Sequence, residues 1–129
     1  MDEETKITWL ERVLLFKIIV TILFWGLPLW IAPESVLNFF SIDFPVDPLF
    51  MRTLGGTMIG LTFLYWFALQ NPVKNRDIVR YGVIDNAIAF FTILITAFIS
   101  GASAPVVWVS VLLVAFFAVA FYYLTPKAA

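Results

Sequence analysis

Four long apolar runs constrain this chain more than any other feature of its sequence. They cover residues 13–32, 49–69, 78–99 and 106–124. Each run has about the 20 residues that a helix needs to cross about 30 Å of hydrocarbon, because an α-helix rises about 1.5 Å per residue. The sequence therefore predicts an all-α polytopic membrane protein, with one transmembrane domain whose four helices form an antiparallel bundle.

The composition also indicates lipid contact. Of the 129 residues, 62% are hydrophobic and 13% are charged, whereas a soluble domain is about half apolar and about a quarter charged. A small domain buries only part of its surface, so this chain cannot hide all of its apolar side chains from water. We expect a multi-pass protein of the cell membrane that is surrounded by lipids.

Several kinds of site are excluded by residue counts. The chain has no cysteine and no histidine, which removes thiolate nucleophiles, disulfides, iron–sulfur clusters, Cys/His zinc sites and histidine-ligated haem. The acidic residues do not show the spacing of metal ligands, so we expect neither a metal site nor a cofactor. A net charge of −1 does not favour nucleic acid as a partner, because that would require a basic face.

The basic residues predict the orientation of the helices. If both termini are cytoplasmic, seven of the eight lie on the cytoplasmic side, and the exception is Arg52. This is the bias expected of cytoplasmic loops. Because the residues before the first run are acidic, we expect that run to be a retained helix rather than a cleaved signal. Tryptophan and tyrosine, which prefer the headgroup level, cluster near the inner boundary (Trp9, Tyr65, Trp66, Tyr81, Tyr122, Tyr123) and mark the outer one (Trp30, Trp108).

The connections between the runs differ in character. Residues 70–77 and 100–105 are short links, which make the helices on either side antiparallel neighbours. The first outer connection contains an apolar segment at about 34–42, where we predict a short helix in the membrane interface that ends before Pro45. Pro28, two residues after Gly26, predicts a kink in the first helix.

Small residues at helical spacing predict how the helices pack. The second run carries Thr53, Gly56, Thr57 and Gly60 along one stripe. In lipid, where no hydrophobic force joins helices, small residues allow backbones to approach closely. We interpret the stripe as a packing face within the chain, with a homodimer contact or a ligand cleft as the alternatives. It favours a close pair with the third run, whose matching residues are Gly82, Asn86 and Ala89.

Charged residues at membrane depth form the second candidate site. Asp85 lies about two turns into the third run, and Lys17 enters the first run from the same predicted side. An ionised carboxylate at this depth is costly unless it is paired or takes up a proton. One interpretation is a structural Lys17–Asp85 pair with Asn86 as a hydrogen-bonding neighbour. The other is a proton or cation site inside the bundle, and the sequence leaves both open.

Arg52 is the third candidate. In the predicted orientation it lies near the outer surface, directly after a loop that contains Glu34, Asp43 and Asp47. We expect these acids to neutralise Arg52 and to hold the interfacial helix over the end of the bundle. The alternative is that Arg52 binds an anionic headgroup or a substrate carboxylate, for which its planar guanidinium is suited.

The middle of the chain resembles a known group of proteins. A Pro-Glu pair after the first run, a short apolar segment and then Arg-x-x-Gly-Gly-x-x-x-Gly are similar to small four-helix membrane proteins of the DoxX-like group. The matching residues are Pro33, Glu34, Arg52, Gly55, Gly56 and Gly60. The resemblance implies the four-helix fold. It also implies an accessory-subunit role, since some DoxX-like proteins are linked to quinone-dependent membrane oxidoreductase systems.

No set of residues resembles a catalytic constellation. Within the runs, serine and threonine side chains more often bond the neighbouring backbone than react. Our first expectation is therefore a non-catalytic accessory or scaffold subunit that packs against a membrane protein partner or a second copy of itself. The alternative is a small transporter or channel, or a lipid- or quinone-binding protein that uses the bundle interior around Asp85. Catalysis is the third possibility.

Overall fold

The computed structural model describes residues 1–127, which form helices and connecting loops without any strand. This confirms the predicted all-α class. In chain order the elements are α1 (Glu3–Val20), the π-helix η1 (Thr21–Gly26), α2 (Leu27–Ile31), α3 (Glu34–Phe39), α4 (Leu49–Gln70), α5 (Arg76–Ser100) and α6 (Pro105–Leu124). α1 begins well before the first apolar run, because the Asp2 side chain accepts a hydrogen bond from the Thr5 backbone N–H at 2.7 Å and caps the first turn.

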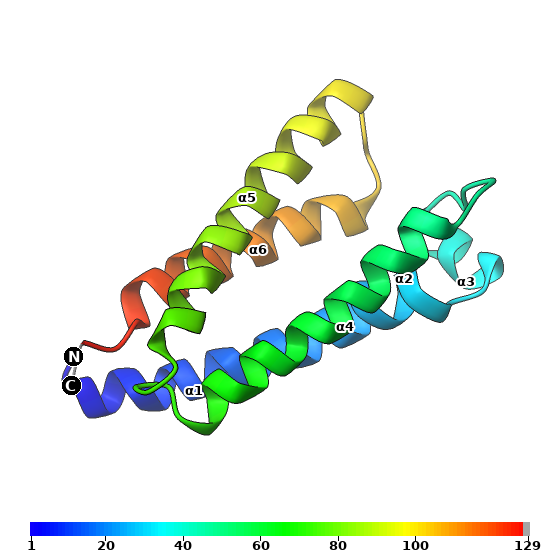
Figure 1. The fold of residues 1–129 in the computed structure, drawn as a ribbon. Helices are drawn as coiled ribbons and strands as arrows, with labels where there is room; N and C mark the ends of the chain where they lie inside the picture. The colour runs from blue at the N-terminus through cyan, green and yellow to red at the C-terminus, as the bar shows by residue number, and fades with distance from the viewer. Residues whose placement is uncertain (128–129) are drawn as a thin grey trace.

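The helices form two hairpins. In the first hairpin, α1, η1 and α2 make one long segment, and α4 packs antiparallel along it; in the second, α5 packs against α6 (Figure 1). The hairpins meet at the end that holds the start of α1 and the end of α6, and they diverge toward the other end (Figure 1). α4 and α5 are consecutive but touch each other little. The predicted close pair between the second and third runs is therefore replaced by contacts within each hairpin.

Three helical segments are long and apolar enough to cross a membrane. They are Glu3–Ile31, Arg76–Ser100 and Pro105–Leu124. α4 has the length of a span at 22 residues, but Arg52 and the interspersed glycine and threonine residues reduce its hydropathy, and it is not among the three. The membrane character is shown by these three segments, while the fourth span stays a prediction.

The core lies where the two hairpins meet. Leu10, Leu14, Tyr65, Phe117 and Phe121 are completely buried there. The Tyr65 and Phe121 rings stack at 5.7 Å between centroids, so α4 of the first hairpin is joined to α6 of the second. Tyr65 was expected at the headgroup boundary, but burial against these rings places it in the core instead. This packing fixes the closed end of the fold.

The first hairpin is held by a glycine, but not by the predicted stripe. A Cβ added at Gly55 would lie 2.6 Å from the Leu29 carbonyl carbon and 2.7 Å from the Trp30 Cα atom, so the α2 and α4 backbones touch at this point. Gly56 faces the edge of the Trp30 indole, and Gly60 has open space within 4 Å. Thr53 and Thr57 are exposed, and the Thr57 hydroxyl donates to the Thr53 backbone carbonyl oxygen at 2.8 Å within α4. The backbone contact between α2 and α4 thus lies at Gly55, one residue before Gly56 of the predicted stripe.

The second hairpin also has its glycine contact. A Cβ at Gly82 would lie 2.9 Å from the Phe121 ring and 3.2 Å from the Tyr65 ring. Gly82 therefore lets α5 approach the core, as a small residue was predicted to do, although its main neighbour is α6. The outer connection contains α3, a short helix within the predicted 34–42 segment, which is anchored by the buried Leu37.

Candidate functional site

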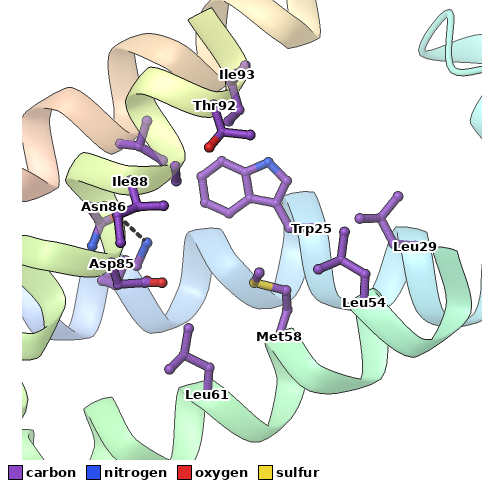
Figure 2. Close-up of a pocket in the computed structure, with 13 residues that line it drawn as sticks. Trp25, Leu29, Leu54, Met58, Leu61, Asp85, Asn86, Ile88, Thr92 and Ile93 are labelled. Carbon is purple, nitrogen blue, oxygen red and sulfur yellow. Dashed lines mark hydrogen bonds between the residues drawn. The ribbon is translucent and has the colours of Figure 1, made fainter. Parts of the chain in front are cut away.

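A cleft of about 430 Å³ lies between the two hairpins. Its walls come from both of them, and most of the lining is apolar. Leu29, Leu54 and Met58 line the first-hairpin wall, and Ile88 and Ile93 line the α5 wall (Figure 2). Because the hairpins diverge, the cleft is closed at the core and open toward the far end.

The polar side chains of the cleft gather at its closed end. Lys17 of α1 donates from Nζ to Asn86 Oδ1 of α5 at 2.7 Å, and this bond is buried. Asn86 in turn donates from Nδ2 to the Gly82 carbonyl oxygen at 2.7 Å and to the Tyr65 hydroxyl at 3.5 Å. These bonds fix the orientation of the Asn86 amide and connect three helices, so the site is rigid where the hairpins join.

The Lys17 ammonium is enclosed by aromatic rings. Its Nζ lies 4.6 Å from the centroid of the Phe117 ring, 5.3 Å from Trp25 and 5.7 Å from Tyr65. Lys17 is only 4% exposed. A buried cation requires compensation, which here comes from one amide oxygen and the faces of three rings.

Asp85 differs from its neighbour. Its side chain lies at the closed end and points into the cleft (Figure 2). The predicted Lys17–Asp85 ion pair is not formed: within residues 1–127 the structure has a salt bridge between Arg80 and Asp77 at 3.3 Å and none at Asp85. The reason is the rotation of α5, which directs Asn86 rather than Asp85 at Lys17. The acid is thus left facing the cleft.

Trp25 lies in the middle of the cleft (Figure 2). It belongs to η1, where the Leu27 N–H bonds back to the Ile22 carbonyl oxygen, five residues earlier. Pro28 has no N–H to continue an α-helical ladder, and the residues before it form this π-helical segment. The kink expected at Pro28 stays a prediction. The Trp25 indole N–H donates across the cleft to Ser110 Oγ of α6 at 3.1 Å.

The Trp25–Ser110 contact was not predicted from the sequence. The sequence did contain one signal for it. Trp25 lies in the centre of an apolar run, away from the membrane boundaries where indoles collect. Ser110 also donates to the Val106 carbonyl oxygen at 2.8 Å, the backbone bond expected of a serine within a helix. Its oxygen is therefore free to accept the indole N–H and to hold the two hairpins at a fixed separation.

Arg52 lies outside the cleft and binds the end of α2. It donates to the Leu29 carbonyl oxygen at 3.3 Å and to the Ala32 carbonyl oxygen at 2.7 Å. In an α-helix the Leu29 oxygen would bond the N–H of residue 33, but that residue is Pro33. Within the described residues Arg52 has no ion pair with the loop acids that were expected to neutralise it. Its partners are carbonyl groups at a helix C-terminus, where a cation is stabilised.

The remaining predicted residues divide between the cleft and the surface. Ala89, predicted to pack between helices, lines the cleft beside Asn86. Gly60, Thr53 and Thr57 lie on an exposed face of α4. Among residues 1–127 no group of three or more acidic side chains is arranged to hold a metal ion. The structure thus brings Lys17, Asp85 and Asn86 together and separates Arg52 from them.

Comparisons with other proteins do not assign the chain. No protein-family model, curated protein or solved structure matches it. The resemblance to the DoxX-like group therefore stays a prediction.

Proposed function

We propose that the chain crosses the membrane four times, with α4 as the second span and both termini on the cytoplasmic side. The antiparallel contact of α4 with the first hydrophobic segment supports this topology. So do the exposed apolar side chains of α4, such as Phe63 and Phe67. The start of α1, the end of α6 and the α4–α5 connection lie at the same end of the molecule (Figure 1), and this connection carries Lys74. Its basic residues would then face the cytoplasm, and α3 would lie at the outer interface.

We further propose that the protein binds a lipid-soluble molecule in the cleft between the hairpins. The observation that carries this proposal is the cleft itself, which is about 430 Å³ in volume and combines apolar walls with a polar closed end. Small-molecule sites between helices commonly have volumes of about 300–1,000 Å³ and a few polar groups that orient the ligand. An amphipathic molecule would place its apolar body along Leu54 and Ile88 and its polar end near Asp85.

The position of the core favours binding over conduction. The fully buried Leu14, Tyr65 and Phe117 pack beyond the polar end of the cleft. An ion that reached Asp85 would meet this packed layer rather than a continuing path. At the other end, Ile88 and Leu54 are exposed, so a ligand can enter sideways from the hydrocarbon. The proposed role is therefore that of a binding protein for a membrane-soluble compound.

The test is extraction of small molecules from protein purified out of its native membrane. We compare the wild type with Ala89→Phe, which places a ring in the cleft, and with Val119→Phe, which adds the same ring to a residue of α6 that is 69% exposed. We expect a compound at about one per chain in the wild type and in Val119→Phe, and its loss from Ala89→Phe. Equal recovery from all three variants, or recovery of bulk lipid alone, would overturn the proposal.

A second candidate function is an accessory or scaffold subunit, which was the first expectation from the sequence. One observation favours it. Thr53, Thr57 and Gly60 form an exposed face of α4, and a Cβ at Gly60 would meet nothing within 4 Å. Small residues on a lipid-facing surface permit close approach by another helix, from a different membrane protein or from a second copy.

The two candidates are separated by one further variant. Gly60→Leu fills the exposed face and leaves the cleft unchanged. A partner function requires that Gly60→Leu lose a co-purifying protein, or lose the dimer in a cross-linking experiment, while Ala89→Phe keeps it. If Gly60→Leu behaves as the wild type in both measurements, the exposed face serves no partner.

A further inference from the structure

The hydrogen-bonding inventory of the cleft defines what kind of polar group it accepts. Several donors at the closed end are already directed at oxygens of the protein. Both Asn86 amide N–H groups are directed at protein oxygens, those of Gly82 and Tyr65. The Trp25 N–H is bonded to Ser110, and Lys17 gives one of its three N–H donors to Asn86 while its Nζ lies over the Phe117 ring. A ligand carbonyl placed at Asn86 or Trp25 would therefore compete with bonds that the fold already makes.

The Asp85 carboxylate is an acceptor that the cleft leaves open to a ligand. The Asp85 carboxylate lines the cleft and points into it (Figure 2). No cation lies within ion-pairing distance of it in the described part of the chain. An ionised carboxylate has two oxygens that accept hydrogen bonds and no donor. The Tyr65 hydroxyl lies near this carboxylate, but most of the cleft lining is apolar, so a donor carried by a ligand would stabilise the charged group further.

We propose that the cleft selects ligands whose polar end is an uncharged hydrogen-bond donor, an alcohol or phenol hydroxyl carried on an apolar body. This inference rests on the proposed binding function and specifies its substrate class. The hydroxyl donates to Asp85, and the apolar body lies between Leu54 and Ile88. A neutral group fits better than an ammonium, because the Lys17 ammonium, bonded to the adjacent residue Asn86, already brings a positive charge to the same end of the cleft. A second cation would be repelled by Lys17.

The experiment uses three probes of equal chain length: 1-dodecanol, dodecyl methyl ether and dodecylamine. The full chain is labelled with 5-fluorotryptophan and placed in lipid nanodiscs, and the ¹⁹F resonance of Trp25 is assigned with Trp25→Phe. Each probe is titrated as a mole fraction of the bilayer. The ether has a methyl group where the alcohol has its donor hydrogen, so comparing the two in the wild type and in Asp85→Ala separates the bond to Asp85 from the effect of the methyl group.

The expected result is that the alcohol half-saturates the Trp25 shift at an about tenfold lower mole fraction than the ether, the effect of one hydrogen bond to a charged group. Asp85→Ala removes this preference, while Asp85→Asn, which keeps an acceptor oxygen, retains part of it. The amine is expected to bind more weakly than the alcohol.

Each of the other outcomes contradicts a specific part of the proposal. If alcohol and ether bind equally and Ala89→Phe blocks both, the cleft is a binding site but the donor rule is wrong. If the amine binds most tightly, the site selects cations and the neutral assignment is wrong. If no probe shifts Trp25 in the wild type, both this inference and the proposed function fail.

Discussion

The Arg52 guanidinium on α4 donates to the Leu29 carbonyl oxygen of α2, the oxygen that Pro33 leaves without its α-helical donor. Three residues further along α4, Gly55 lies against the backbone of Leu29 and Trp30. Arg52 and Gly55 thus act on the same turn of α2. Arg52 donates to the carbonyl groups at the end of α2, and Gly55 lets the α2 and α4 backbones meet. The Arg-x-x-Gly spacing therefore has a structural explanation in the first hairpin.

The first prediction concerns Arg52. Arg52→Ala leaves the Leu29 and Ala32 carbonyl groups without their donors, and we expect it to lower the free energy of unfolding by about 1–3 kcal/mol. Arg52→Lys keeps the charge but not the paired donors of the guanidinium, so its loss is intermediate. Both are measured by detergent-induced unfolding in mixed micelles.

Arg80→Ala is the matched control for that measurement. Its bond to Asp77 joins side chains that are 57% and 86% exposed, and such pairs contribute between nothing and about 1 kcal/mol. If Arg52→Ala costs no more than Arg80→Ala, the α2 carbonyl groups do not depend on Arg52 and the explanation of the motif is wrong.

The second prediction separates Gly55 from Gly60. Gly55→Ala forces its Cβ into the α2 backbone, and we expect a loss of about 1–3 kcal/mol in the free energy of unfolding, as for other overpacked sites. Gly60→Ala meets nothing within 4 Å, so the gain of up to about 1 kcal/mol in helix propensity is expected to dominate. Equal effects of the two substitutions would contradict a close backbone contact between α2 and α4 at Gly55.

The third prediction is a double-mutant cycle at the closed end of the cleft. Asn86→Leu leaves the Lys17 ammonium buried without its oxygen, and we expect a loss of about 3–5 kcal/mol, as when one partner of a buried pair is removed. Lys17→Met leaves the Asn86 oxygen without a donor and costs less. The double variant removes both groups, so it should be more stable than the sum of the single losses predicts, by about 0.5–3 kcal/mol.

Strict additivity would contradict this coupling. The measurement is again the unfolding free energy in mixed micelles. Asp85→Leu serves as the control for the cycle, because Asp85 is not bonded to Lys17 in the described chain. Combined with Lys17→Met, it should show much weaker coupling than Asn86→Leu does. If Asp85 couples to Lys17 as strongly as Asn86 does, the ion pair first predicted from the sequence is the correct one.

The fourth prediction concerns the separation of the hairpins. Ser110→Ala removes the acceptor of the Trp25 indole, so the α5–α6 hairpin should move more freely relative to α4. The chain has no cysteine, and spin labels can therefore be attached at Phe50→Cys and Ile99→Cys, two exposed positions on α4 and α5. We expect a broader distance distribution in Ser110→Ala than in the parent. Val109→Ala, the control at the adjacent exposed position, should leave it unchanged.

Several features of the fold follow from the sequence alone. The lengths of the apolar runs predicted the long helices, because the thickness of the hydrocarbon layer determines how many residues a span requires. The separation into two hairpins was not predicted. Short links make consecutive helices antiparallel, but they do not determine whether α4 packs on α5 or on α1. That choice depends on contacts such as Gly55 against Trp30 and Tyr65 against Phe121.

The errors in the candidate site share a physical cause. Adjacent residues of an α-helix point about 100° apart, so a pattern that finds Asp85 and Asn86 cannot tell which of them meets Lys17. The same uncertainty applies to Gly55 and Gly56. Trp25 lies within a π-helical segment, whose wider turns change the direction in which its side chain points. Residue types at membrane depth were therefore identified, whereas their partners required the structure.

The most direct test of the central claim is native mass spectrometry of the full chain, released intact from nanodiscs made with its own membrane lipids. A bound cleft ligand predicts one adduct of defined mass on the 14.7 kDa chain. The adduct should be retained by Val119→Phe and absent from Ala89→Phe. A wild-type chain with no adduct, or adducts of mixed lipid mass that Ala89→Phe retains equally, would contradict a binding site between the hairpins.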